Sequence, residues 1–138
     1  TGMCSEMDGG VHQICMNVDP ATQDFSRDTY QSNWSRSRSG QTHCMCLGAW
    51  ALYKARQNAG QIPRTTGELV CPAIPETALS SRYLSKWNYW NGHQIDDQVR
   101  DGVEALYKQC YAEGTPPERR YLRRRYKQLA REIGLPPI

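Results

Sequence analysis

Residues 96–134 read DDQVRDGVEALYKQCYAEGTPPERRYLRRRYKQLAREIG, and this stretch decides how the C-terminal part of the chain folds. Thr115, Pro116 and Glu118 form the pattern of a capping box, in which Thr takes the N-cap, Pro the first turn and Glu the third helical position. The apolar residues that follow recur at i, i+4, i+7 and i+11, and they are Leu122, Tyr126, Leu129 and Ile133. Gly134 then ends the pattern. We therefore predict an amphipathic helix from residue 116 to about residue 132.

A second helix is predicted directly before this one. Its apolar positions are Val99, Val103, Leu106 and Cys110. Asp96 or Asp97 is placed to cap its first turn, and adjacent carboxylates at a helix start do not face each other as an acid–base pair would. We expect residues 95–138 to form a helical extension with a basic terminal helix, added to an α+β core of residues 1–94.

The remaining residues alternate between short strand patterns and helical patterns. Strands are predicted at residues 11–18 and 68–73, and helices at residues 22–30, 44–57 and 75–90. The chain is therefore predicted to be an α+β protein, a small single domain with a few short strands and about four to five helices.

Two of these predicted helices have apolar faces that are expected to pack in the core. The inward face of the helix at 44–57 is predicted to contain Leu47, Trp50, Ala51 and Lys54. The stem of Lys54 is expected to cover apolar surface. In the helix at 75–90, Trp87 and Trp90 fall on the apolar stripe and are interpreted as core. Tyr89 lies off that stripe and is predicted to face solvent or a partner.

Composition indicates a folded chain with a thin aliphatic core. Val, Ile, Leu and Phe account for 21 of 138 residues, a share typical of disordered chains. However, the net charge is only +3, and the chain has 4 Trp and 8 Tyr, which argues for folding. No run approaches 18 apolar residues, so no transmembrane segment is predicted. A core this small is expected to need a disulfide, a metal or a partner surface for full stability.

The positive charge is concentrated at the C-terminal end. Residues 116–138 carry a charge of +5, whereas the residues before them carry −2. The basic residues are Arg119, Arg120, Arg123, Arg124, Arg125, Lys127 and Arg131. Such asymmetry is typical of a tail that meets an acidic partner, a nucleic acid or an anionic membrane, although a solvated helix face gives the same pattern.

Two segments resemble a known family. Residues 10–15 read GVHQIC and are followed by Phe25 and Ser26, while residues 40–46 read GQTHCMC and are followed by Trp50. They are similar to a small uncharacterised bacterial and algal family known as domain of unknown function 2237. The hallmarks of this family are Gly-x-His-x-x-Cys with a distant Phe, and Gly-Asp-x-Trp-Cys-Leu-Cys-x-x-x-Trp.

The resemblance covers roughly residues 4–90 and includes a weaker match at residues 73–79, which read AIPETAL. The chain departs from the family at three positions. His43 stands in place of Trp, Ala49 in place of the usual Arg, and Pro75 in place of His. If that Arg and His take part in chemistry, this chain lacks it. Because the family has no established reaction, the resemblance implies a fold and leaves the function open.

Six cysteines allow up to three disulfides in 15 connectivities. Cys71 and Cys110 each lie in an apolar pattern, and we interpret both as reduced, buried cysteines. A disulfide from Cys15 to Cys44 or to Cys46 would join the two family-like segments. A free-thiol site is the alternative to that disulfide.

His12, Cys15, Cys44 and Cys46 are the candidate metal ligands. Their spacing argues against zinc, because His12 and Cys15 diverge in a strand, Cys44 and Cys46 diverge in a helix, and zinc turns use Cys-x₂₋₄-Cys. We therefore expect no cofactor and keep zinc as an alternative. A cysteine at a helix N-terminus with His43 or His12 as base would instead be a candidate nucleophile.

We predict a non-catalytic accessory or structural subunit of a larger assembly, which docks on other protein subunits through the basic C-terminal helix and an aromatic surface that includes Tyr89. One alternative is a thiol- or metal-dependent enzyme or redox protein that uses the cysteine and histidine cluster. A second alternative is a nucleic-acid-binding subunit. The chain begins at Thr1, which leaves a processed mature form and a fragment as alternatives. The compartment is not indicated, and an organelle or an assembled particle would fit a processed form.

Overall fold

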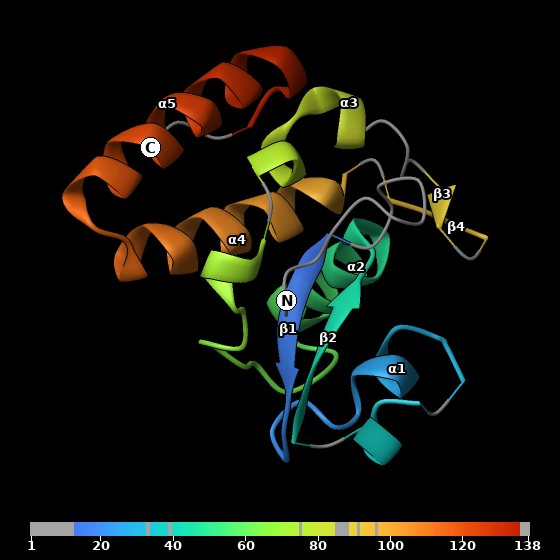
Figure 1. The fold of residues 1–138 in the computed structure, drawn as a ribbon. Helices are drawn as coiled ribbons and strands as arrows, with labels where there is room; N and C mark the ends of the chain where they lie inside the picture. The colour runs from blue at the N-terminus through green and yellow to red at the C-terminus, as the bar shows by residue number, and fades with distance from the viewer. Residues whose placement is uncertain are drawn as a thin grey trace.

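The structure is a computed structural model that describes residues 13–32, 34–38, 40–74, 76–84, 89–90, 92–95 and 97–135. Within these residues the chain is an α+β protein, as the sequence predicts, with two small antiparallel sheets and a larger share of helix. The two long C-terminal helices, α4 (Val99–Glu113) and α5 (Pro116–Ile133), lie next to each other on one side of the molecule (Figure 1).

The first sheet is an antiparallel pair. β1 (Ile14–Val18) and β2 (Gln41–Met45) are aligned so that Ile14 lies opposite Met45. β1 confirms the strand predicted at 11–18 over its described residues. The connection contains the short helix α1 (Phe25–Asp28), whose first residue is fully buried, as expected for the turn predicted there.

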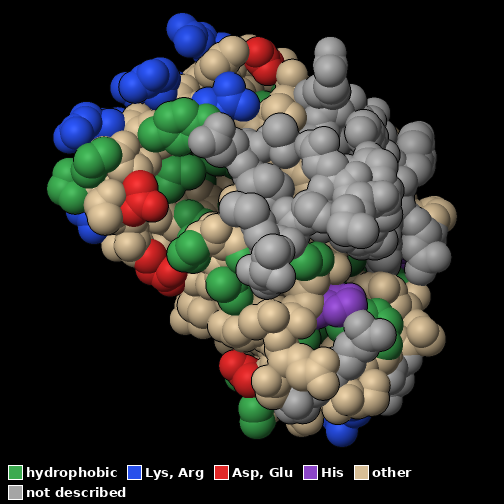
Figure 2. Space-filling model, in the orientation of Figure 1, with side chains coloured by type: hydrophobic (Ala, Val, Ile, Leu, Met, Phe, Trp, Pro, Cys, Tyr) green, Lys and Arg blue, Asp and Glu red, His purple; other side chains and the backbone are tan. Residues whose placement is uncertain are grey.

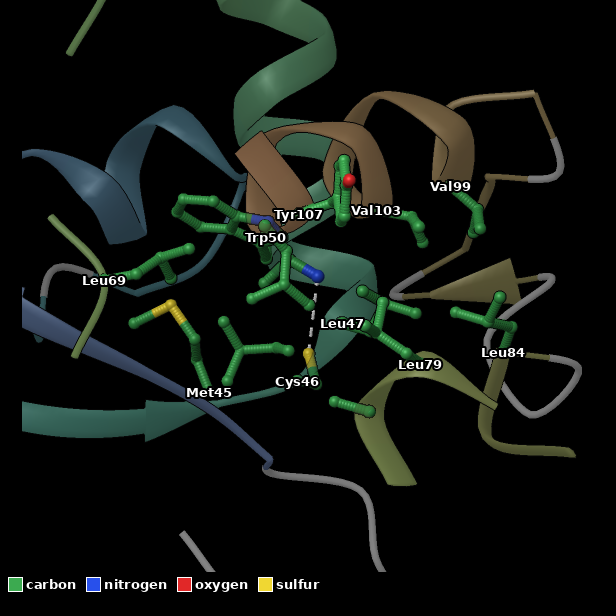
Figure 3. Packing of buried hydrophobic residues seen from close by; sticks show 14 of the residues in the cluster. Met45, Cys46, Leu47, Trp50, Leu69, Leu79, Leu84, Val99, Val103 and Tyr107 are labelled. Atoms are coloured by element: carbon green, nitrogen blue, oxygen red, sulfur yellow. Dashed lines mark hydrogen bonds between the residues drawn. The ribbon is translucent and has the colours of Figure 1, made fainter. Parts of the chain in front are cut away.

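The helix predicted from residue 44 begins later, because residues 44 and 45 belong to β2. Cys46 is the N-cap of α2 (Leu47–Asn58), and its Sγ accepts a hydrogen bond from the backbone N–H of Ala49 at 3.4 Å (Figure 3). The predicted inward face is confirmed, since its four members are all buried. They are Leu47, Trp50, Ala51 and Lys54.

α4 crosses α2 at a glycine. The indole Nε1 of Trp50 donates a hydrogen bond to the carbonyl oxygen of Gly102 at 2.9 Å. A Cβ atom at Gly102 would lie 2.9 Å from the Cα of Ala51 and 3.1 Å from Cδ1 of Trp50. These distances are shorter than van der Waals contact, so the two helices approach this closely because position 102 has no side chain.

We therefore expect Gly102→Ala to lower the free energy of unfolding by about 1–3 kcal/mol, because overpacking forces backbone shifts. Helix propensity alone predicts the opposite, a gain of about 1 kcal/mol from Gly to Ala in a helix interior. Urea denaturation of the wild type and the variant decides between the two. A stabilised variant would show that α2 and α4 are not in close contact at this position.

The strand expected at residues 68–73 is reduced to one antiparallel bridge between Leu69 and Met16. The chain then enters a 3₁₀ helix, η2 (Cys71–Ala73), whose proline has no N–H to donate to a neighbouring strand. Instead, the backbone of Leu69 pairs with the side chain of Gln109 in α4. The Gln109 side chain accepts a hydrogen bond from the N–H of Leu69 at 3.0 Å and donates one to the carbonyl oxygen of Leu69 at 2.9 Å. The prediction of a strand was wrong beyond the bridge.

The helix expected at residues 75–90 is broken into shorter pieces. The described residues form a 3₁₀ helix, η3 (Glu76–Leu79), and a single α-helical turn, α3 (Ser81–Leu84). The buried side chains of Leu79 and Leu84 keep this segment attached to the core.

Trp90 belongs to a second sheet and not to a helix. β3 (Tyr89–Trp90) pairs with β4 (His93–Gln94) in a short antiparallel hairpin. Gly92 in the turn has φ 81°, and glycine adopts this conformation at no steric cost. Trp87 lies outside the described residues.

The N-terminus of α4 differs from the prediction. Gln98 occupies the N-cap without a side-chain hydrogen bond, so the expected cap by Asp97 is wrong. Asp96 lies outside the described residues. The apolar stripe of α4 is confirmed, because its four members are buried. They are Val99, Val103, Leu106 and Cys110.

α5 begins with the predicted capping box. The hydroxyl of Thr115 accepts a hydrogen bond from the N–H of Glu118, and the carboxylate of Glu118 accepts one from the N–H of Thr115 at 2.8 Å. This bond from the backbone lowers the pKa of the Glu118 carboxyl. Gly134 ends the helix in a left-handed conformation with φ 76°.

One hydrophobic cluster joins the strands and the main helices. Ile14 of β1, Trp50 of α2, Val103 of α4 and Leu129 of α5 all belong to it. Aromatic and sulfur-containing side chains fill much of the remaining space, as the low aliphatic content predicts (Figure 3).

A disulfide closes the cluster on the side of α4. Cys71 in η2 and Cys110 in α4 are bonded, with Cα atoms 5.5 Å apart and a separation of 39 positions in sequence. The expectation that both are reduced was therefore wrong. Each does lie in apolar surroundings, but the turn that brings η2 against α4 is not visible in local sequence patterns.

Candidate functional site

The predicted cysteine and histidine cluster is only partly assembled. Cys15 and Cys44 are opposite each other in the β1–β2 register. Cys44 is disulfide-bonded, while Cys15 and Cys46 are buried and form no disulfide. Neither disulfide expected from Cys15 therefore forms. His12 lies outside the described residues.

Cys15 and Cys46 are poorly placed for nucleophilic chemistry. Burial raises the pKa of Cys15, which disfavours the reactive thiolate. Cys46 does lie at the N-terminus of a helix, as expected for an activated cysteine, but its side chain is 4% exposed. The ring of His43 packs against Trp34 at 4.6 Å between centroids. Among the described residues, no group of three or more His, Cys, Asp or Glu side chains is arranged to hold a metal ion.

The basic helix is the feature that the structure presents most openly. Five of its seven basic residues are exposed and make no ion pair within the described part of the chain. They are Arg120, Arg123, Arg124, Lys127 and Arg131. Figure 2 shows this surface as a row of Lys and Arg side chains along α5. We refer to these five residues as the basic face.

Geometry explains why the basic face points outward. Arg120, Arg124, Lys127 and Arg131 are spaced i, i+4, i+7 and i+11, so they follow one side of the helix for about 16 Å. Arg120 and Arg124 each lie two residues from Leu122, and two residues rotate an α-helix by about 200°. These four members of the basic face are therefore on the side of α5 that faces away from Leu122, and Arg123 lies at their edge, four residues before Lys127.

The other two basic residues have different surroundings. The guanidinium of Arg119 donates hydrogen bonds to the carbonyl oxygens of Tyr111 and Ala112, both at 3.0 Å, and so satisfies the C-terminal end of α4. Arg125 is half-buried, and its Nε is buried without a hydrogen-bond partner. Both were predicted as partner-binding residues. In the structure, the guanidinium of Arg119 holds the end of α4 against the start of α5.

Tyr89 was predicted to extend the docking surface. Its backbone forms part of the β3–β4 hairpin. Its side chain lies outside the described part of the structure. The predicted contribution of Tyr89 to an aromatic surface therefore stays a prediction.

A buried ion pair was missed by sequence reasoning. Lys54 Nζ lies 2.5 Å from Glu68 Oε1, and the two side chains are 10% and 2% exposed. The ammonium group also donates to Gln57 Oε1 at 2.9 Å and to the carbonyl oxygen of Thr65 at 3.0 Å, and it lies 4.9 Å from the ring centroid of Trp50. The signal was a lysine on an apolar helix face, and we predicted only that its stem covers apolar surface. The pair instead anchors the loop before Leu69 to α2.

None of the described helices combines the length and the apolar character needed to cross a membrane. Comparison with protein-family models, with curated proteins and with solved structures gave no match. The resemblance to domain of unknown function 2237 therefore stays an expectation, and the function is argued from the surface of the molecule.

Proposed function

We propose that this chain is a non-catalytic accessory subunit of a larger protein assembly, and that the basic face of α5 docks on an acidic surface of a neighbouring subunit. The observation that supports this proposal is the uncompensated charge on one side of a well-anchored helix. Its opposite side is fixed to the core by Tyr126 and Leu129, which are each 1% exposed. The basic residues are thus presented on a rigid support.

The chemistry of the basic face favours a protein partner over a nucleic acid. Four of its five members are arginines, whose planar guanidinium groups bind carboxylates in a bidentate manner. Interfaces for single-stranded nucleic acid usually add aromatic side chains on which bases stack. Tyr126 is buried, and Tyr121, which is three residues from Arg124, is half-buried. The basic face therefore has one half-buried tyrosine at its edge and no row of exposed aromatic rings on which successive bases could stack.

The proposal is tested by charge reversal in the source cells. Wild-type chain carrying a small tag is expected to sediment in a native lysate as part of a particle much heavier than its own 15.8 kDa. Arg120→Glu combined with Arg124→Glu is expected to weaken docking at least tenfold, or by about 1.4 kcal/mol, and to shift the chain towards its own mass. Cross-linking of the wild type is expected to map to an acidic protein surface.

The matched control is Arg64→Glu combined with Lys108→Glu. It changes the net charge by the same amount at two exposed positions outside α5. This variant is expected to remain in the particle. The proposal fails if the wild type sediments as an isolated chain, if both double variants are released equally, or if nuclease treatment releases the wild type. The last result would identify a nucleic acid as the partner.

A further inference from the structure

An apolar groove of about 560 Å³ lies between the first half of α5, the 3₁₀ helices and α4. This volume is in the range of roughly 300–1,000 Å³ that is typical of small-molecule sites. The apolar residues that line it include Ile74, Ala78, Leu79, Leu106 and Leu122, and the Cys71–Cys110 disulfide also contributes. In Figure 2, hydrophobic side chains gather beneath the row of Lys and Arg side chains on α5.

The groove exists because the two halves of α5 pack differently. Tyr126 and Leu129 in the second half are buried in the core. In the first half, Tyr121 and Leu122 are only half-buried, and both line the groove. The N-terminal half of the helix therefore forms a wall with exposed apolar surface.

The polar groups of the groove are unequally satisfied. Glu113 accepts a hydrogen bond from Gln109 Nε2 at 2.7 Å, and Glu118 accepts one from the N–H of Thr115 at 2.8 Å. Arg125 also lines the groove, but its buried Nε has no partner. The polar group that still lacks a partner is thus the positively charged guanidinium of Arg125, through its Nε–H. An anionic acceptor is the partner that would satisfy it best.

Position along the helix sets the orientation of an occupant. Arg125 is seven residues beyond Glu118, or about 10 Å along α5. Glu113 and Glu118 are at the end of the groove near the α4–α5 turn, so this end disfavours an anion. An occupant that complements these charges has one anionic group at Arg125 and an apolar body along the disulfide.

We infer that the groove binds an amphiphile with a single carboxylate, of the chemical class of a medium- or long-chain fatty acid. The carboxylate accepts hydrogen bonds from the guanidinium of Arg125, which lines the groove and turns so that its buried Nε–H and a neighbouring N–H face the two oxygen atoms. The alkyl chain covers the side chains of Leu106 and Leu122 and the Cys71–Cys110 disulfide. This site is separate from the basic face, because Arg125 is rotated by about 100° around α5 from its neighbour Arg124.

The inference is tested with dodecanoate and the full chain by isothermal titration calorimetry, with dodecanol and dodecyl phosphate as comparison ligands. Dodecanoate is expected to bind one per chain in the micromolar range, and at least tenfold more tightly than dodecanol. Arg125→Gln is expected to remove this difference by weakening dodecanoate at least tenfold and leaving dodecanol unchanged. Ile74→Trp, which fills the groove, is expected to abolish binding of both ligands.

Arg124→Gln is the matched control, because it removes the same charge one residue away on the basic face. It is expected to bind dodecanoate like the wild type. The inference is overturned if dodecanoate does not bind at 1 mM, if Arg124→Gln and Arg125→Gln weaken it equally, or if dodecanol or dodecyl phosphate binds as tightly. The charge-reversal variant of the basic face is expected to retain dodecanoate binding, so failure of this inference and failure of the docking proposal are distinguishable.

Discussion

Replacing Cys71 and Cys110 together with alanine is expected to lower the free energy of unfolding by about 4 kcal/mol. The two cysteines are 39 residues apart, and breaking a cross-link of this length restores chain entropy to the unfolded state. Guanidinium denaturation of the wild type and the double variant measures the loss. The denaturant dependence of the unfolding free energy is expected to steepen, because the unfolded chain without the cross-link exposes more surface.

Cys71→Ala alone is the control for this prediction, because it breaks the same bond and leaves the buried thiol of Cys110 in place. Its loss of stability is expected to be close to that of the double variant. If the losses of the two single variants instead add up to that of the double variant, the cysteines contribute through packing and the cross-link is not the cause. The disulfide of Cys44 is unchanged in all these proteins.

The sequence predicted best where the signal is local. The capping box at Thr115, the helix end at Gly134 and the apolar stripes of α4 and α5 are all present. Each depends on residues that are neighbours on one helix, so spacing along the chain is enough to reveal it.

Prediction failed where structure depends on distant residues. Residues 44 and 45 fit a helical pattern, but β1 pairs with them, and the helix begins only after Cys46. Leu69 forms one bridge, and Trp90 belongs to a hairpin where a helix was expected. Strand pairing is set by partners far away in sequence, and a pattern of apolar residues does not identify these partners.

The candidate site also has a part that local sequence signals predicted and a part that depends on distant residues. The basic helix was predicted correctly as a helix, but the different surroundings of its arginines follow from tertiary contacts. Arg119 binds the carbonyl groups at the end of α4, and Arg125 lines a groove that needs α4 and the 3₁₀ helices to exist. Sequence spacing could assign the basic face but could not separate these two residues from it.

A disulfide and stacked aromatic rings add to the contacts of the small aliphatic core. The Cys71–Cys110 disulfide links η2 to α4, and Tyr107 stacks on Tyr126 at 4.4 Å between ring centroids. Burial raises the pKa of both phenols, so they remain neutral donors at physiological pH. The structure therefore adds a disulfide and aromatic packing between α4 and α5 to the small aliphatic core.

Lys54→Met is expected to lower the free energy of unfolding by about 3–5 kcal/mol, because it leaves Glu68 charged, buried and without its cation. Glu68 is poorly compensated in the variant, since its Oε2 already has no hydrogen-bond partner. Thr65 is expected to lose one of its contacts with α2 at the same time, because its carbonyl oxygen accepts from Lys54, while its hydroxyl keeps the hydrogen bond from Gln57. Chemical denaturation measures the loss of stability, and hydrogen exchange of residues 65–69 reports the loosening of the loop.

A double-mutant cycle separates the pair from the burial of each charge. Adding Glu68→Met to Lys54→Met is expected to recover most of the loss, because replacing both partners of a buried ion pair with apolar side chains is often neutral or stabilising. Lys108→Met is the control, since the Lys108–Glu104 pair is on the surface and is worth at most about 1 kcal/mol. If the double variant is no more stable than Lys54→Met, the lysine contributes through its contacts with Gln57, Thr65 and Trp50. Recovery in the double variant would show that the cost comes from an uncompensated carboxylate beneath the 65–69 loop.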